Sequence, residues 1–186
     1  FDPHEPFHAP PRFRELYPTS YEGPILDWPI YDRVTETPEE IAELRANYSA
    51  LVTMTDEYFG RLLDVFDAHD LWSDTALILT TDHGFLLGEH DWWAKNRMPV
   101  YDEIAHIPLL IYHPDYADAG GTRRKSLTQT ADIMPTILDM AGLAIPDDVT
   151  GKSLLPLLAK DDECRDSLVF GYFGAACNVT DGRYVY

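Results

Sequence analysis

The sequence predicts an α/β fold, with a mostly parallel sheet flanked by helices. Two continuously apolar runs, 75–81 and 107–112, have the length and composition of buried strands. A longer segment, 38–70, carries apolar residues at helical spacing and comes before the first of them. Strands that alternate with helices in this way are typical of a parallel sheet covered by helices.

The composition is that of a globular chain with an acidic surface. Its 186 residues are enough for one domain with a core. The 14 basic and 32 acidic side chains give a formal net charge of −18, which argues against nucleic acid or an anionic membrane as a partner. No apolar run approaches the roughly 20 residues of a membrane span. The chain opens at Phe1 without a signal-peptide pattern, and we expect it to be a fragment.

Residues 1–37 are rich in proline, aromatic residues and histidine, and no helical or strand period survives the prolines. We therefore expect an ordered loop or crossover there. Such loops usually cover a core, but His4, His8 and Arg12 could be functional. Prolines on both sides of His4 stiffen the backbone and would hold its imidazole in place.

The segment 38–70 is predicted to be one amphipathic helix that serves as scaffold. Thr37 is a suitable N-cap, Pro38 fits the first helical position, and two glutamates follow at the positive end of the helix dipole. Gly60 lowers helix stability, so we expect it to mark a close packing contact.

The rest of the chain is predicted to complete one α/β core at 75–160 and to begin a C-terminal strand region at 165–186. Its elements, in order, are a short strand at 125–130, a helix at 132–141 capped by Thr130 or Asp132, a short helix at 151–159, and strands at 168–173 and 183–186.

The loop that follows the first strand holds the side chains best suited to chemistry. Asp82 leaves a rigid strand and offers the carboxylate oxygen that calcium, magnesium or manganese prefer. His83 can add a nitrogen ligand or donate to a bound anion. Lys95 can neutralise an anionic oxygen or protonate a leaving group, and His90 is a second candidate proton carrier.

Two other catalytic motifs are absent from the sequence. No serine lies in the Gly-x-Ser-x-Gly elbow of a Ser-His-Asp hydrolase. Gly151-Lys152-Ser153 imitates the end of a phosphate-binding P-loop, but the first glycine of that motif would fall on Pro146, and no strand precedes it.

Several stretches, in this order, resemble the C-terminal part of the catalytic domain of the sulfatase family, within the alkaline-phosphatase-like superfamily. They are the His-x-Pro-Phe loop at His4-Glu5-Pro6-Phe7, the scaffold helix, TTDHGFLLGEHDWWAK at 80–95, IPLLI at 107–111, DIMPT at 132–136, and GKSL at 151–154. Each stretch is a weak signal alone, but their shared order is specific.

The resemblance implies a role for each matching residue. Asp82 and His83 would complete the site of one divalent cation, usually calcium, with Mn²⁺ or Mg²⁺ as alternatives. Lys95 and His4 would contact the sulfate group or its leaving oxygen, and His90 would be secondary. The substrate would be a sulfate ester of a small molecule or a saccharide.

The family nucleophile is a formylglycine made from a cysteine in a Cys-x-Pro/Ala-x-Arg motif. Neither Cys164 nor Cys177 fits that motif or a zinc-type spacing, so the formylglycine is expected in a missing N-terminal part. We expect the 186-residue chain by itself to lack turnover and to bind divalent cations weakly. A phosphonate or phosphodiester hydrolase of the same superfamily and a non-catalytic metal-binding module remain alternatives.

Overall fold

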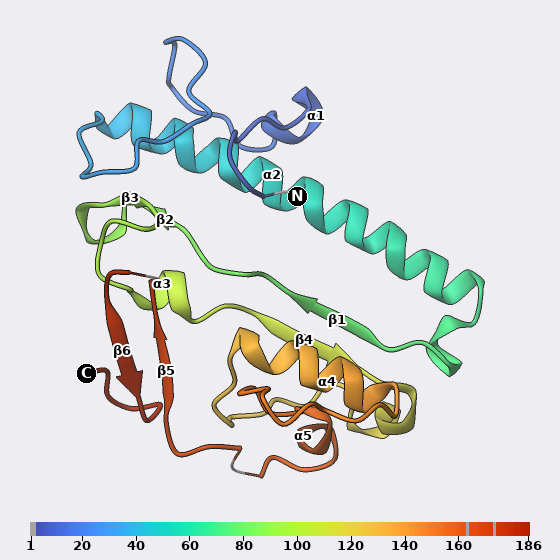
Figure 1. Ribbon diagram of the computed structural model, residues 1–186. Helices are drawn as coiled ribbons and strands as arrows, with labels where there is room; N and C mark the ends of the chain where they lie inside the picture. The colour runs from blue at the N-terminus through green and yellow to red at the C-terminus, as the bar shows by residue number, and fades with distance from the viewer. Residues whose placement is uncertain (1–2, 163, 173) are drawn as a thin grey trace. The chain divides into compact units, whose positions relative to one another are not determined.

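The computed structural model of the chain describes residues 3–162, 164–172 and 174–186. The chain folds into two compact units. The first contains the described residues up to Ser73 together with Gly84–Pro99, and the second contains Asp74–His83 together with Val100–Tyr186. Figure 1 shows the elements of both units, and each unit is treated separately.

The first unit is built on one long helix, α2 (Pro38–Ala68), which confirms the helix predicted at 38–70. The Thr37 side chain accepts a hydrogen bond from the Glu40 backbone N–H at 3.3 Å. In return, the Glu40 carboxylate accepts one from the Thr37 N–H at 2.8 Å. This capping box satisfies N–H groups that the start of a helix leaves unpaired. A 3₁₀ turn, η1 (Leu71–Ser73), follows the helix.

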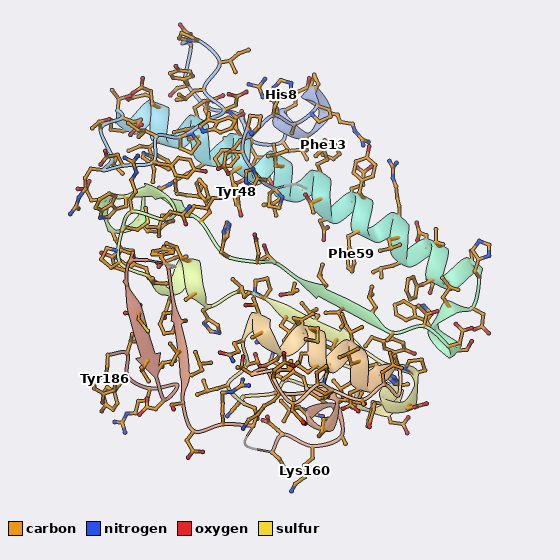
Figure 2. All side chains as sticks on the ribbon, viewed as in Figure 1. His8, Phe13, Tyr48, Phe59, Lys160 and Tyr186 are labelled. Atoms are coloured by element: carbon orange, nitrogen blue, oxygen red, sulfur yellow. The ribbon has the colours of Figure 1, made fainter. Side chains whose placement is uncertain are left out.

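The N-terminal segment packs its aromatic side chains on α2. It contains one short helix, α1 (Pro11–Arg14), which lies beside α2 (Figure 1). The prolines led us to expect no helix there, but Pro11 occupies the start of the helix, where no N–H is needed. Phe13 is buried at 3% exposure and lies by α2 (Figure 2). The buried cluster consists of Phe7, Ala9, Phe13, Leu44, Ala50, Leu51, Trp93 and Ala94.

Two short strands of the first unit have no counterpart among the predicted elements. β2 (Leu86–Leu87) and β3 (Trp93–Ala94) pair antiparallel and are joined through the turn η2 (Glu89–Asp91). Arg45 on α2 donates from Nε to the Leu87 carbonyl at 2.7 Å. This hydrogen bond connects the β2–β3 ladder to α2.

In the second unit, β1 (Leu77–Thr80) and β4 (Leu109–Tyr112) confirm the strands predicted at 75–81 and 107–112. They pair antiparallel, in the register that places Leu77 opposite Tyr112. In the part of the chain that the structure describes, every named ladder is antiparallel, whereas we expected a mostly parallel sheet. The reason is that the segment after β1 returns the chain to the same end of the ladder.

The same ladder corrects the prediction that these two strands are buried. Leu79 and Leu110 lie opposite one another and are 36% and 58% exposed. A continuously apolar run is therefore consistent with a strand that is only half buried.

The helix predicted at 132–141 is confirmed as α4 (Ile133–Met140), which follows a 3₁₀ turn, η4 (Thr130–Asp132). We expected the Asp132 side chain to cap α4, but it forms no capping hydrogen bond there. Its fully buried carboxylate instead accepts hydrogen bonds from Arg165 Nη1 at 2.7 Å and Nη2 at 2.6 Å.

The Asp132 carboxylate also accepts backbone N–H bonds from Gln129 at 2.9 Å and from Lys152 at 2.8 Å. It thus joins three segments of the second unit. Gly151 makes this approach possible, because a Cβ at that position would lie 2.0 Å from the Ala131 carbonyl oxygen. The remaining helical elements are α3 (Asp102–Ala105), η3 (Pro114–Ala119) and α5 (Leu155–Ala159), the last of which corresponds to the helix predicted at 151–159.

The C-terminal region is a two-stranded antiparallel hairpin of β5 (Leu168–Gly171) and β6 (Cys177–Thr180). β5 confirms the strand predicted at 168–173, of which residue 173 lies outside the described residues. The strand predicted at 183–186 is wrong: Val185 forms only an isolated bridge. The sequence pattern favoured the aromatic and β-branched residues at 184–186 over Cys177–Thr180, which form β6.

Two further expectations are also wrong. Residues 125–130 form no strand, because the Asp161 carboxylate takes the N–H groups of Lys125 and Ser126. Gly60 does not mark a packing contact, since a Cβ there would meet nothing within 4 Å. Among the described residues, no helix has the length and apolar character that crossing a membrane requires.

Candidate functional site

The predicted site residues fall in both units. His4, His90 and Lys95 belong to the first unit, and Asp82 and His83 belong to the second. The two groups are therefore described one after the other, each within its own unit.

In the first unit, Lys95 and His4 come together although 91 positions separate them. The Lys95 Nζ lies 3.2 Å from His4 Nε2. The lysine side chain is only 9% exposed, whereas that of His4 is 56% exposed. A lysine ammonium is rarely so well buried without a partner. The pair thus places a buried lysine amine beside an accessible imidazole.

Backbone geometry places Lys95 in this buried position. It follows β3 directly and lies between Ala94 and Asn96, whose φ angles are 72° and 78°. Non-glycine residues seldom adopt positive φ, and such strain gathers at functional sites. The Phe85 ring adds to the setting, with its centroid 5.8 Å from Lys95 Nζ, within the range of a cation–π contact.

Glu5, beside His4, is a member of the site that the sequence did not identify. Its side chain is 1% exposed, with Oε1 3.8 Å from Lys95 Nζ and Oε2 3.5 Å from His4 Nδ1. The imidazole Nδ1 also lies 2.7 Å from the Glu5 carbonyl oxygen. The one signal available in the sequence was an acidic residue inside the His-x-Pro-Phe loop.

The other candidates of the first unit lie at the surface. His90 is exposed in the turn η2 with a φ of 55°. The His8 Nδ1 lies 3.8 Å from an Asp27 carboxylate oxygen, and Arg12 donates to Glu57 at 2.9 Å. Arg12 is thus engaged in a surface ion pair.

In the second unit, Asp82 and His83 follow β1 as predicted. The Asp82 carboxylate is 83% exposed, and Oδ2 lies 3.5 Å from His83 Nε2. Oδ1 accepts the His83 backbone N–H at 3.0 Å and the Thr81 hydroxyl at 3.3 Å. Partial desolvation by itself would raise the pKa of Asp82. The charge of His83 and these hydrogen bonds outweigh desolvation, so the pKa lies below its ordinary value.

The Asp82–His83 pair fits one edge of a site for a hard divalent cation. It offers an ionised carboxylate with an exposed oxygen and an adjacent imidazole nitrogen. Calcium needs six to eight oxygen ligands. Within residues 3–162, 164–172 and 174–186, no three His, Cys, Asp or Glu side chains form a metal-holding group. Further ligands would have to come from elsewhere.

The elements are those of an α/β protein, with a buried lysine beside an accessible histidine in one unit and an exposed carboxylate beside an imidazole in the other. The family model described as Sulfatase matches residues 2–143, so the chain belongs to the sulfatase family. Its fold corresponds to a part of the catalytic domain of alkaline-phosphatase-like sulfatases.

Curated relatives agree with this assignment. The N-acetylglucosamine-6-O-sulfatase of Bacteroides thetaiotaomicron is 38% identical over 115 residues, which cover 62% of this chain and 20% of that protein. Human arylsulfatase K is 37% identical over 121 residues, covering 65% of this chain and 22% of that protein. The chain therefore spans about a fifth of the length of these curated relatives.

Two solved structures are similar to the chain in fold. The structure of BT4656 in complex with its substrate D-glucosamine-2-N,6-O-disulfate matches with a TM-score of 0.60 and 26% identity, over 77% of this chain and 31% of that one. The phosphonate monoester hydrolase of Agrobacterium radiobacter matches with a TM-score of 0.68 and 26% identity, over 81% of this chain and 34% of that one.

Proposed function

We propose that the protein to which this chain contributes hydrolyses sulfate esters, and that the chain supplies the anion-binding and proton-donating side of the active site. The observation that carries the proposal is the buried Lys95 ammonium, held 3.2 Å from the His4 imidazole within the region that matches the sulfatase family. A sulfate ester is an anion, and its hydrolysis releases an alcohol oxygen that must acquire a proton.

Lys95 and His4 can meet both needs. The Lys95 ammonium places a positive charge beside a sulfate oxygen, in a site where burial strengthens the attraction. As a nucleophile oxygen from another part of the protein bonds to sulfur, the bond between sulfur and the ester oxygen breaks. Its electron pair stays on the ester oxygen, which takes a proton from the lysine–histidine pair. His90, on the exposed turn η2, is kept as a secondary proton carrier.

Asp82 and His83 would hold the divalent cation, for which calcium is the preferred candidate. Sulfatases generally use a divalent metal and a formylglycine. The cation, when bound, neutralises negative charge that develops on the sulfate oxygens. The ionised, exposed Asp82 carboxylate suits this role, and His83 lies beside it. Neither Cys164 nor Cys177 lies in a formylglycine motif, so the nucleophile is assigned to another part of the protein.

For the substrate, we propose a sulfated saccharide. Two similar proteins carry such a substrate in their descriptions: the N-acetylglucosamine-6-O-sulfatase, and BT4656 with its disulfated glucosamine. A phosphonate monoester is the second candidate, favoured by the match to the Agrobacterium radiobacter hydrolase. Sulfate and phosphonate monoesters both present anionic oxygens that Lys95 can bind.

The test is kinetic and uses the whole protein with 4-nitrophenyl sulfate and a 4-nitrophenyl phosphonate as substrates. Lys95→Ala is expected to lower kcat for the sulfate by about 10²–10⁴-fold, the range typical of losing a general acid. Lys125→Ala, which removes an exposed lysine of the second unit, is the matched control and should retain full activity. Faster turnover of the phosphonate would reverse the order of the two candidates. Unchanged sulfate hydrolysis by Lys95→Ala would rule out the assigned role.

A further inference from the structure

The Glu5 carboxylate is buried without a hydrogen bond. Its side chain is 1% exposed, and neither Oε1 nor Oε2 has a hydrogen-bond partner. An ionised carboxylate is strongly disfavoured in such a place unless nearby charge compensates it. Its presence beside the lysine–histidine pair therefore calls for an explanation.

Two nitrogen atoms flank this carboxylate. Oε1 lies 3.8 Å from Lys95 Nζ, and Oε2 lies 3.5 Å from His4 Nδ1. The Lys95 separation is too long for a hydrogen bond but short enough for direct charge compensation. Lys95 itself is buried, so the carboxylate and the amine are both shielded from solvent and lie next to one another.

The two ring nitrogens of His4 have neighbours that suit one donor and one acceptor. Its Nδ1 is 2.7 Å from the Glu5 carbonyl oxygen, which can only accept, so Nδ1 carries a hydrogen. Its Nε2 is 3.2 Å from Lys95 Nζ. A protonated Lys95 can only donate, so Nε2 would then accept with its lone pair. In this arrangement the proton that the pair delivers is the one carried by Lys95.

We propose that Glu5 is a positioning residue whose carboxylate keeps this proton on Lys95. Without the carboxylate, the ammonium would be buried with no counter-charge, and burial favours the neutral amine. With it, the ammonium is retained at the place where it meets an anionic oxygen. Glu5 does not touch the substrate; it acts through Lys95. The catalytic meaning of this role rests on the proposed sulfate-ester hydrolysis, but the charge compensation itself does not.

A purely structural role for Glu5 makes a different prediction. Glu5→Gln keeps the shape of the side chain and removes only its charge. If Glu5 only fills space, the chemistry of the Lys95 amine should not change. If it is the counter-charge, more of the amine should be neutral, and only the neutral amine reacts with acylating reagents.

The experiment measures acylation of each lysine by acetic anhydride at mildly alkaline pH, with peptide mass spectrometry as the readout. Lys125, Lys152 and Lys160 serve as internal references. We expect Glu5→Gln to raise the relative rate at Lys95 by about tenfold, the effect of a shift of one pH unit in its protonation. Glu5→Asp, which keeps the charge, and Glu15→Gln, which removes an exposed acid of the same unit, should stay within about twofold of the parent chain.

An unchanged Lys95 rate in a folded Glu5→Gln chain overturns the proposal. If Glu5→Gln does not fold, the double variant Glu5→Gln/Lys95→Met decides. If the two charges compensate one another, removing both in the double variant should restore folding. A double variant that stays unfolded refutes the compensation. The tenfold rise together with no sulfatase activity in the whole protein would refute the proposed function and leave the role of Glu5 intact.

Discussion

Replacing Asp132 by asparagine tests whether one buried ion pair holds the second unit together. Asp132 is 0% exposed and the Arg165 side chain is 8% exposed. Asparagine has nearly the same volume, but it has no charge and only one acceptor oxygen. Arg165 stays charged in the variant, because a guanidinium does not lose its proton in proteins. In the parent chain, the hydrogen bonds to Asp132 outweigh burial and raise the pKa of Arg165 further.

The expected magnitude follows from the partners that remain. Removing one member of a buried ion pair typically costs about 3–5 kcal/mol. Arg165 Nη1 keeps the Leu127 carbonyl as an acceptor at 2.9 Å. The loss should therefore lie at the lower end, and we expect Asp132→Asn to reduce the free energy of unfolding by about 3 kcal/mol.

Urea unfolding followed by far-UV circular dichroism measures this change. For a slope of about 1–3 kcal/mol/M, the midpoint should fall by about 1–3 M. Because the chain has two units, hydrogen exchange at β1 and β4 should assign the loss to the second unit. Asp162→Asn makes the same chemical change in an exposed pair with Lys160, whose side chain is 77% exposed, and should leave the midpoint unchanged (Figure 2). Equal midpoints for the two variants would refute the reasoning.

Two further predictions concern backbone conformation and pH. Gly60→Ala should raise the stability of the first unit by about 0.5–1 kcal/mol, because a Cβ there meets nothing within 4 Å; a lower urea midpoint would show that α2 is tightly packed at this point. The hydrogen bond from the Lys125 backbone N–H, followed by those from Ser126, holds the pKa of Asp161 below its ordinary value of about 3.9. Its contribution to stability is thus complete above that ordinary value and is lost as the pH falls through the lowered pKa. Asp161→Asn should reduce the loss of stability that urea unfolding detects as the pH falls through this range. An unchanged pH dependence would count against the hydrogen bond between Asp161 and the Lys125 N–H.

Signals that act within a few residues were predictable from the sequence. Thr37 and Pro38 identified the start of α2, because capping chemistry needs only neighbours along the chain. The two apolar runs identified β1 and β4. Their pairing direction was not predictable, because it depends on the path of the chain between them.

Long-range pairings explain what was missed. Asp132 read as a helix cap because its partner Arg165 lies 33 positions away. Lys95 and His4 were each candidates from their chemistry, but only the family resemblance put them in one site. The position of Glu5 inside the His-x-Pro-Phe loop was its only signal, since burial of a carboxylate depends on tertiary structure. Whether Asp82 and His83 complete a metal site stays a prediction.

The burial of Lys95 itself depends on a break in strand geometry. In a regular strand, successive side chains alternate between faces, yet Trp93, Ala94 and Lys95 are all buried. The left-handed φ values of Ala94 and Asn96 break this alternation. Asparagine tolerates this conformation, whereas alanine loses about 1–2 kcal/mol there. Asn96→Ala should therefore lower the urea midpoint of the first unit and Asn96→Gly should not. Equal midpoints would mean that the left-handed turn does not hold Lys95 in solution.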